Sequence, residues 1–253
     1  MLSKKLIEKE LKKLGIEPPK IIFYDEIDST NTRAKEYGKE HKNGDTVVFI
    51  ADSQTAGRGR RGRSFVSNKG AGIYISILTY PKDQGFDATS ATAKAAVSLA
   101  RAVEKVSDCD VKIKWVNDLY LGGKKLAGIL TEGEMDESGR IAYQVVGMGI
   151  NVYKNAISEE IKDIATSIEH ERNVAQNRSL LAANIIKEFL CNDKDYYAEY
   201  KSRSLIIGKN VKVIKLSENY DAKVIDINPD FSLSIESNGN TEKLFTGEIS
   251  IKI

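Results

Sequence analysis

Short blocks of apolar residues, continuous or alternating with polar ones, recur along the first half of the chain and predict strands. The three clearest are "IIFYDEI" (21–27), "TVVFIAD" (46–52) and "GIYISILTY" (72–80). Between the first two, "DSTN" supplies N-cap residue types for a helix near 29–41. An alanine-rich segment from about Ala88 to Val106 carries its larger apolar residues at helical spacing, which predicts a long helix.

The second half continues with strands and then changes to helices. "VKIKWVNDLYL" (111–121) and "KKLAGILTEGEM" (125–135) predict a strand pair joined by a glycine turn at 122–123. "AYQVVGMGINV" (142–152) predicts another buried strand, and helices are expected near 158–169 and 178–202.

From Leu205 onward the pattern changes to short alternating strands, with a tight turn at Asn238-Gly239. This predicts a small SH3-like β-barrel over 205–253. The expected fold class is therefore α+β, with a mixed β-sheet flanked by helices in a catalytic domain at 1–204. Residues 1–20 of that domain contain a short amphipathic helix.

Composition narrows the class of protein. The 253 residues are 41% hydrophobic and 29% charged, with no run near the roughly 18 apolar residues that a membrane helix needs, and no cleavable signal. We therefore expect a soluble, cytoplasmic protein.

Cys109 and Cys191 lie far apart without CxxC spacing, which indicates buried free thiols. His41 and His170 lie in strongly polar stretches, so no histidine triad or histidine-rich metal centre is expected.

The segment "AGRGRRGRSF" (56–65) holds four arginines within six positions, spaced by Gly57, Gly59 and Gly62. The net charge is only +2, so this charge is local and favours one anionic ligand over a long polyanion. The glycines match G-x-G-x-x-G, but a strand follows where a dinucleotide-binding turn would open a helix. No kinase lysine context and no P-loop pattern is present. We interpret the segment as a mobile cationic lid that an anionic ligand would order.

A second polar cluster interrupts the predicted strand pair. Lys114, Asn117 and Asp118 precede the turn, while the polar positions after it include Lys125 and Glu132. An Asn-Asp pair commonly marks a turn or bulge. A carboxylate and an amide at a strand end, with a lysine on the partner strand, also suit a magnesium nucleotide and a substrate carboxylate. The residues alone leave both interpretations open.

Taken together, "DSTN", "QTAGRGRRGRSF", "KWVNDLYLGGKKLAGILTE" and "GMGINV" resemble the signature segments of biotin protein ligases, in the right order and over about 22–152. The resemblance implies a catalytic domain related to class II synthetases and a two-step reaction. Biotin and MgATP would give biotinyl-5′-AMP and pyrophosphate. A lysine of a biotin carboxyl carrier domain would then take the biotinyl group and release AMP. Such chemistry works by positioning and electrostatics and needs no catalytic histidine.

The resemblance also implies roles for individual residues. The catalytic residues would be Lys125, Arg58 and Arg60, and Asp118 would hold the Mg²⁺. The residues expected to bind biotin are Ser29, Thr30, Asn31, Gln54, Gly57, Arg58, Gly59, Arg60, Lys125 and Gly128. Those expected to bind ATP are Arg58, Arg60, Arg63, Phe65, Asn117, Asp118, Lys125 and Asn151, with Phe65 stacking on the adenine and Asn151 reading it.

Two departures from the family pattern stand out. Val116 occupies the position where the family usually has proline, which removes no functional group. Only 20 residues precede Ile21, too few for a winged helix-turn-helix, so no operator binding is expected. A homodimer is compatible with the sequence, since exposed sheet edges can pair across a twofold axis.

Two other functions compete with this interpretation. A lipoate or octanoate ligase shares the adenylate chemistry and a related fold, but usually lacks the doubled arginines. An RNA-binding module would interleave aromatic residues with its basic ones, and here Phe65 is the single aromatic residue between Gly57 and Gly70.

Overall fold

The computed structural model describes residues 1–41, 44–81, 88–172, 177–191, 195–215, 219–245 and 248–251. Within these ranges the larger sheet has seven strands in the order β1-β2-β3-β7-β6-β5-β4. β1 and β2 pair in parallel and the other neighbours are antiparallel. The strands are β1 (Lys20–Tyr24), β2 (Val47–Ala51), β3 (Gly72–Thr79), β4 (Lys112–Lys114), β5 (Asp118–Leu121), β6 (Lys124–Met135) and β7 (Ile141–Asn151).

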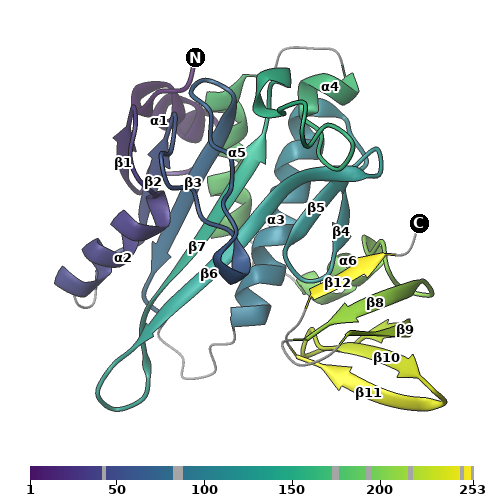
Figure 1. The fold of residues 1–253 in the computed structure, drawn as a ribbon. Helices are drawn as coiled ribbons and strands as arrows, with labels where there is room; N and C mark the ends of the chain where they lie inside the picture. Colours follow the sequence, from purple (N-terminus) through teal and green to yellow (C-terminus); the bar gives the residue numbers. More distant parts are fainter. Residues whose placement is uncertain are drawn as a thin grey trace.

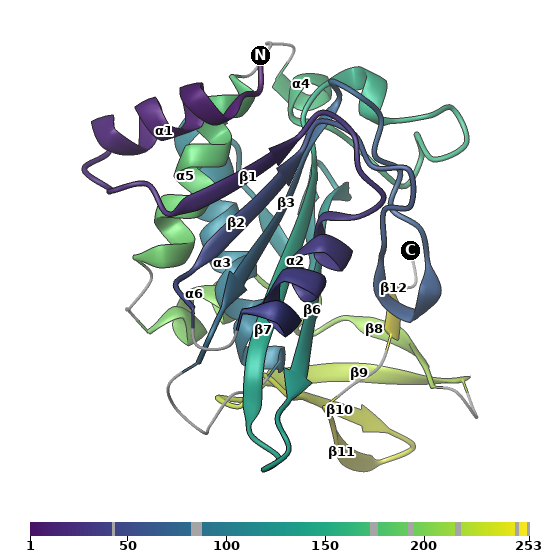
Figure 2. The same cartoon turned by 90° about the vertical axis from the view of Figure 1, so that its left-hand side faces the viewer.

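Helices cover both faces of this sheet (Figures 1 and 2). The expected long helix is α3 (Ala88–Ser107), which packs with α5 (Arg178–Leu190) on one face, and α1 (Lys4–Lys13) packs on α5. α2 (Thr30–Glu40) packs on β2, β3 and β7 from the opposite face. The shorter helices are α4 (Ile168–Arg172), α6 (Tyr196–Ser202), η1 (Arg60–Gly62) and η2 (Lys154–Ala156).

The alternation of side chains along each strand separates the core from the site. On β3, Ile73, Ile75 and Ile77 are fully buried and belong to the main core, which also includes residues of α3 and α5. A second, smaller cluster lies under α2 and includes Phe49 and Leu78. On the same face of the sheet, beyond the N-terminus of α2, the sheet is lined by polar residues.

The C-terminal strands form a five-stranded antiparallel sheet, in the order β11-β10-β9-β8-β12 among the described residues. The strands are β8 (Asn210–Ile214), β9 (Asn219–Ile227), β10 (Leu233–Ser237), β11 (Asn240–Leu244) and β12 (Glu248–Ile251). Asn238 and Gly239 take φ of 51° and 77°, which confirms the predicted tight turn. The sheet is consistent with the expected small β domain, while its boundary at 205 stays a prediction.

The structure corrects the expected strand over 111–121. The chain reverses at Trp115–Asn117, so β4 and β5 are the two arms of a hairpin and Lys114 lies opposite Asp118. The reversal is fixed by distant partners, since the Trp115 Nε1 donates to the Phe231 carbonyl at 2.8 Å. The peptide bond between Trp115 and Val116 is cis. The turn at Gly122-Gly123 is confirmed, with φ of 57° and 80°.

Two helix predictions were also wrong in their extent. The helix expected at 158–169 is a series of turns, and α4 begins at Ile168. The reason is tertiary pairing: Lys125 donates its N–H to the Ile164 carbonyl and accepts from the Thr166 N–H, each at 2.9 Å. The helix expected at 178–202 is divided into α5 and α6.

One of the two cysteines is buried, as expected, and the other is not. Cys109 is buried, but Cys191, at the C-terminal end of α5, is exposed.

No helix in the described ranges combines the length and apolar character needed to span a bilayer.

Candidate active site

A cavity of about 320 Å³ lies on the α2 face of the large sheet, beyond the N-terminus of α2. Its walls come from the start of α2, the loop between β2 and β3, the β4–β5 turn and strands β6 and β7. Most of the predicted site residues line it: Ser29, Thr30, Asn31, Gln54, Arg58, Gly59, Arg60, Arg63, Phe65, Asn117, Asp118, Lys125 and Gly128. The structure therefore brings together segments that are far apart in the sequence.

Glycines form the floor of this cavity. Gly128 on β6 lies opposite Gly149 on β7. A Cβ on Gly149 would lie 2.6 Å from the Phe65 ring, and a Cβ on Gly147 would lie 2.0 Å from the Asn31 Oδ1. Because neither distance is possible for real atoms, glycine at 147 and 149 is what lets Asn31 and Phe65 reach the sheet.

One end of the cavity is lined by neutral polar side chains in a connected network. The Gln54 Oε1 accepts from the Thr30 backbone N–H at 2.8 Å, and the Gln54 Nε2 donates to the Ser67 Oγ at 3.0 Å. The buried Ser76 Oγ lies 2.7 Å from the Thr30 Oγ1 and 2.6 Å from the Asn31 Oδ1. Ser29 is the N-cap residue of α2 by its backbone, yet its side chain makes no capping hydrogen bond and lines the cavity. These fixed dipoles suit a neutral ligand rich in hydrogen-bonding groups.

Glu132 on β6 stabilises this end of the cavity by contacts to α2 and to Arg58. Its carboxylate accepts from the Lys35 Nζ at 2.8 Å and the Asn31 Nδ2 at 3.0 Å, and it pairs with Arg58 at 3.2 Å. Burial acts to raise the pKa of Glu132, but the hydrogen bonds from Lys35 and Asn31, with the charge of Arg58, outweigh it and hold the pKa below its ordinary value. The charged form of Glu132 therefore holds both α2 and the segment 56–65, the arginine loop, in place.

Replacing Glu132 with glutamine is expected to destabilise the fold by about 1–2 kcal/mol near neutral pH, because a charged acceptor with three partners becomes neutral. The pKa of this carboxyl is lowered by folding, so the advantage of the natural chain is present above its ordinary pKa of 4.5 and is lost as pH falls through the folded pKa. Urea unfolding of both proteins from about pH 7 to about pH 3 measures this. A stability difference that stays constant with pH would contradict the assignment.

The other end of the cavity carries the charged residues. The Lys125 Nζ lies 2.8 Å from the Asp118 Oδ1, which also accepts from the Asn117 Nδ2 at 3.0 Å. The Asn117 Oδ1 accepts from Arg60 at 2.9 Å. Burial raises the pKa of the neighbouring Tyr120 to about 12, and the Asp118 carboxylate adds to that rise. This end offers cationic groups and one carboxylate to an anionic ligand.

The arginine loop (56–65) borders the cavity and contacts β6, the β4–β5 turn and β8. Arg58 reaches Glu132, Arg60 reaches Asn117 and Arg61 donates to the Ile214 carbonyl of β8 at 3.3 Å. Figure 2 shows this loop descending from the end of the sheet toward β12. A strand, β3, follows the loop, which bears out the argument against a dinucleotide-binding turn.

Two predicted residues do not line the cavity. A Cβ on Gly57 would lie 2.3 Å from the Phe65 carbonyl oxygen, so Gly57 allows the loop to fold on itself. Asn151 is buried and its Nδ2 donates to the Thr166 carbonyl at 3.1 Å. Its predicted contact with adenine stays a prediction.

Sequence reasoning missed several residues that line the cavity. They are Ser64, Tyr74, Trp115, Tyr120, Ile129, Leu130, Gly147, Met148, Gly149, Ile164 and Ile249. Arg61 and Lys114 also line the cavity, and both belong to the two polar segments noted from the sequence, where neither was given a role. The period-two alternation of β7 was available as a signal, since it places the two glycines of "GMG" on one face. Ile249 lies on β12, so its approach depends on how the two sheets pack and has no local signal.

The described ranges contain no group of three or more His, Cys, Asp or Glu side chains able to hold a metal ion. Asp118 at the charged end suits a Mg²⁺ that arrives with an anionic ligand, since Mg²⁺ is commonly held by one or two carboxylates together with phosphates. The cavity thus pairs a neutral polar end with a cationic end, which fits activation of a polar molecule by a nucleotide.

Comparison with known proteins agrees with this geometry. A profile of the Biotin/lipoate A/B protein ligase family matches residues 23–151. The chain is 30% identical over 260 residues to the bifunctional ligase/repressor BirA of Bacillus subtilis, covering 98% of this chain and 79% of the relative. It is 30% identical to the biotin–[acetyl-CoA-carboxylase] ligase of Mycobacterium tuberculosis, covering 81% of this chain and 79% of the relative.

Solved structures of biotin protein ligases share the fold of this chain. The biotin protein ligase of Aquifex aeolicus in complex with biotin and ATP superposes with a TM-score of 0.79 at 28% identity, covering 93% of this chain and 99% of that one. The Leishmania major enzyme in complex with biotinyl-5-AMP, at 22% identity and a TM-score of 0.64, covers 90% of this chain and all of that one and shares the fold.

Proposed function

Because this chain belongs to the biotin/lipoate A/B protein ligase family, we propose that it is an ATP-dependent biotin protein ligase. It activates biotin as biotinyl-5′-AMP and transfers the biotinyl group to a lysine of a biotin carboxyl carrier domain. The observation that carries the proposal is one cavity whose neutral polar end and cationic end meet above a glycine floor.

The neutral end binds the ureido ring of biotin. Ser29, Thr30 and Gln54 offer hydroxyl and amide groups already held in a network, and a ring with matching donors and acceptors satisfies them. An acyl chain without such groups would bring no hydrogen bond to this network, so the hydrogen-bonding capacity that the network does not use internally would stay unfilled. Asn31, Gly59 and Gly128 complete the wall and the floor, and Gly57 shapes the loop above.

The charged end binds MgATP as a substrate. Arg60 and Arg63 line the cavity and are assigned to phosphate oxygens, since guanidinium groups bind phosphate by paired hydrogen bonds. Arg58, which also lines the cavity and pairs with Glu132, is assigned to the same phosphates. Asn117 and Asp118 face the nucleotide, with Asp118 as the Mg²⁺ ligand from the protein. The adenine contacts assigned here are stacking on Phe65 and recognition by Asn151.

The first step joins a biotin carboxylate oxygen to the α-phosphorus of ATP and breaks the bond from that phosphorus to the pyrophosphate oxygen. No proton is transferred, so the demand on the protein is to hold two anions together and to stabilise the charge at the α-phosphate. Lys125 contacts both reacting groups, and Arg58 and Arg60 exclude water from the adenylate.

The second step transfers the biotinyl group to protein. A carrier lysine amine attacks the carbonyl carbon of the mixed anhydride, AMP leaves with the bonding electrons, and the amine loses a proton. We assign the adenylation chemistry to a domain at 1–204 and a supporting role to the β domain at 205–253, whose Ile249 lines the cavity.

Pyrophosphate release by the purified protein with MgATP tests this function. Biotin, lipoate and octanoate are compared, each with and without hydroxylamine to trap an acyl-adenylate. We expect release and a trapped hydroxamate with biotin alone. Release with lipoate or octanoate instead would keep the chemistry but overturn the substrate, and release with none of the three acids would overturn the proposal.

A further inference from the structure

The turn between β4 and β5 carries part of the charged end of the cavity. Trp115 and Val116 are buried in this turn, Asn117 closes it and Asp118 begins β5. Asn117 accepts from Arg60, and Asp118 contacts Lys125. A small displacement of the turn therefore moves two polar groups of the cavity together.

A tyrosine of α6, Tyr200, donates a hydrogen bond to this turn. The Tyr200 hydroxyl donates to the Val116 carbonyl at 2.9 Å, and the Tyr200 side chain is fully buried. Burial raises the pKa of Tyr200, so the hydroxyl stays protonated and remains a donor. Without this donor the buried Val116 carbonyl would lose its hydrogen bond, and the turn would be held less firmly, by the remaining bonds of Trp115 to Phe231 and of Asn117 to Ile129.

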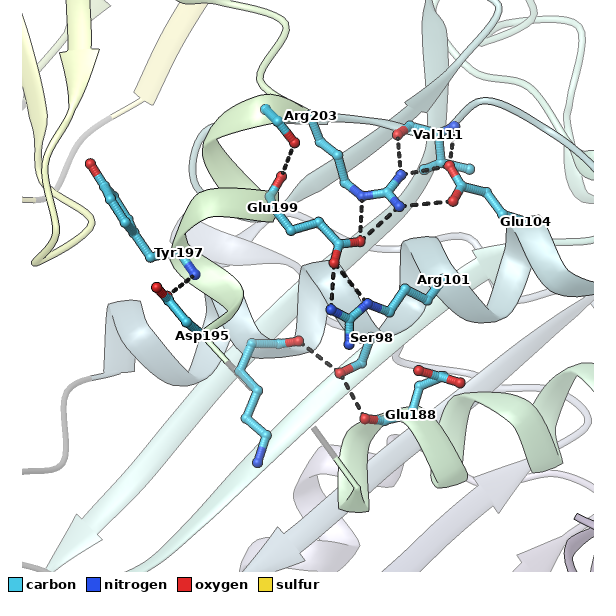
Figure 3. Close-up of polar contacts among 11 residues, drawn as sticks. Ser98, Arg101, Glu104, Val111, Glu188, Asp195, Tyr197, Glu199 and Arg203 are labelled. Carbon is cyan, nitrogen blue, oxygen red and sulfur yellow. Dashed lines mark hydrogen bonds and ion pairs between the residues drawn. The ribbon is translucent and has the colours of Figure 1, made fainter. Parts of the chain in front are cut away.

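Tyr200 lies on α6, which is fixed to α3 by a network of charged side chains (Figure 3). The Glu199 carboxylate accepts from the Arg101 Nε and from the Arg203 Nε, each at 2.9 Å. Arg203 also donates to the Glu104 carboxylate at 2.5 and 2.8 Å and to the Val111 carbonyl at 3.2 Å. The helix is thus held against α3 and against the residue that leads into β4.

The other side of α6 holds the C-terminal sheet. The Tyr197 hydroxyl donates to the Ile227 carbonyl and the Lys201 Nζ to Asp226, each at 2.7 Å. Tyr197 and Tyr200 both pack edge-on against Phe231. The two tyrosines are therefore matched in helix and in aromatic partner, and differ in whether the hydroxyl reaches the cavity turn or the C-terminal sheet.

We propose that Tyr200 is a positioning residue for the nucleotide end of the cavity. Its hydroxyl sets the position of the Val116 carbonyl and so aligns Asn117 and Asp118 with MgATP. The inference rests on the proposed function for the identity of the nucleotide. It assigns no contact between Tyr200 and either substrate, so the biotin end is expected to be unaffected.

The test compares Tyr200→Phe with the control Tyr197→Phe. Calorimetric titration measures the Kd of a non-hydrolysable MgATP analogue, with and without biotin, and the Kd of biotin, and thermal melting confirms folding. We expect Tyr200→Phe to weaken the MgATP analogue about tenfold and to leave the biotin Kd within about twofold. Tyr197→Phe should leave both Kd values near those of the natural chain.

Equal nucleotide affinity in the two variants would overturn the inference, as would an equal loss of biotin and nucleotide affinity in Tyr200→Phe. Failure of the proposed function looks different, since biotin would neither bind to nor trigger pyrophosphate release by the natural chain. If Tyr200→Phe does not fold, Glu199→Gln takes its place, because it loosens the same helix. It is expected to weaken the MgATP analogue and spare biotin, and unchanged nucleotide affinity would overturn the inference.

Discussion

Replacing Lys125 with alanine is expected to slow biotin-dependent pyrophosphate release by roughly 10²- to 10³-fold, the usual cost of removing one preorganised group that stabilises developing charge. The Lys125 Nζ lines the cavity beside Asp118, where the carboxylate of biotin and the α-phosphate meet in the proposed reaction. Since the neutral end supplies most contacts to the ureido ring, biotin affinity should fall far less than the adenylation rate. Single-turnover pyrophosphate release and calorimetric biotin titration separate the two effects.

The adjacent Lys124 provides a matched control for this variant. Its Nζ donates to the Lys162 carbonyl at 2.7 Å and it does not line the cavity, so Lys124→Ala should adenylate biotin at nearly the natural rate. Near-normal adenylation by Lys125→Ala would show that the second polar cluster is not the nucleotide end. An equal loss in both variants would point to a general disturbance of β6.

The second large effect is expected at Arg60. Arg60→Ala removes the hydrogen bond to Asn117 that ties the arginine loop to the β4–β5 turn, together with one cation facing the phosphate. We expect biotinyl-adenylate to escape into solution about tenfold faster or more, while the fold stays intact. Single turnover with a trap for released adenylate, assayed by labelled AMP, measures the leak.

Lys69→Ala is the control for that experiment, because Lys69 is a cation between the same two strands that does not line the cavity. It should retain the adenylate as the natural chain does. Unchanged leakage from Arg60→Ala would count against the loop as a lid over the adenylate.

The strands and the site could be predicted wherever the chemistry is local. The apolar residues of β3 and β7 predicted two strands, and the N-cap residue types before α2 predicted where that helix begins; the observed bounds lie close to the predicted ones. The arginine loop was correctly expected between two strands. Ser29 shows the limit of such local signals. It sits at the N-cap position, yet its side chain is used in the cavity and makes no capping hydrogen bond.

Contacts between distant residues decided what the sequence did not show. The reversal at Trp115–Asn117 depends on Phe231 and Tyr200, which lie more than 80 residues away, so the pattern of 111–121 alone looked like one strand. The segment before α4 forms backbone hydrogen bonds with Lys125 and is therefore not helical, although its sequence predicted a helix. Glycine is required at 147 and 149 because Asn31 and Phe65 pack against these positions, and these two residues come close to the strand only in the folded chain.

Transfer of biotin to protein tests the central claim most directly. A biotin carboxyl carrier domain is incubated with the purified chain, MgATP and biotin, and its mass is then measured beside a version whose acceptor lysine is replaced by arginine. The account predicts one biotinyl group on that lysine, dependent on both substrates and absent from the arginine version. An unmodified carrier domain that an authentic biotin ligase does modify, or a domain modified with lipoate or octanoate instead, would contradict it.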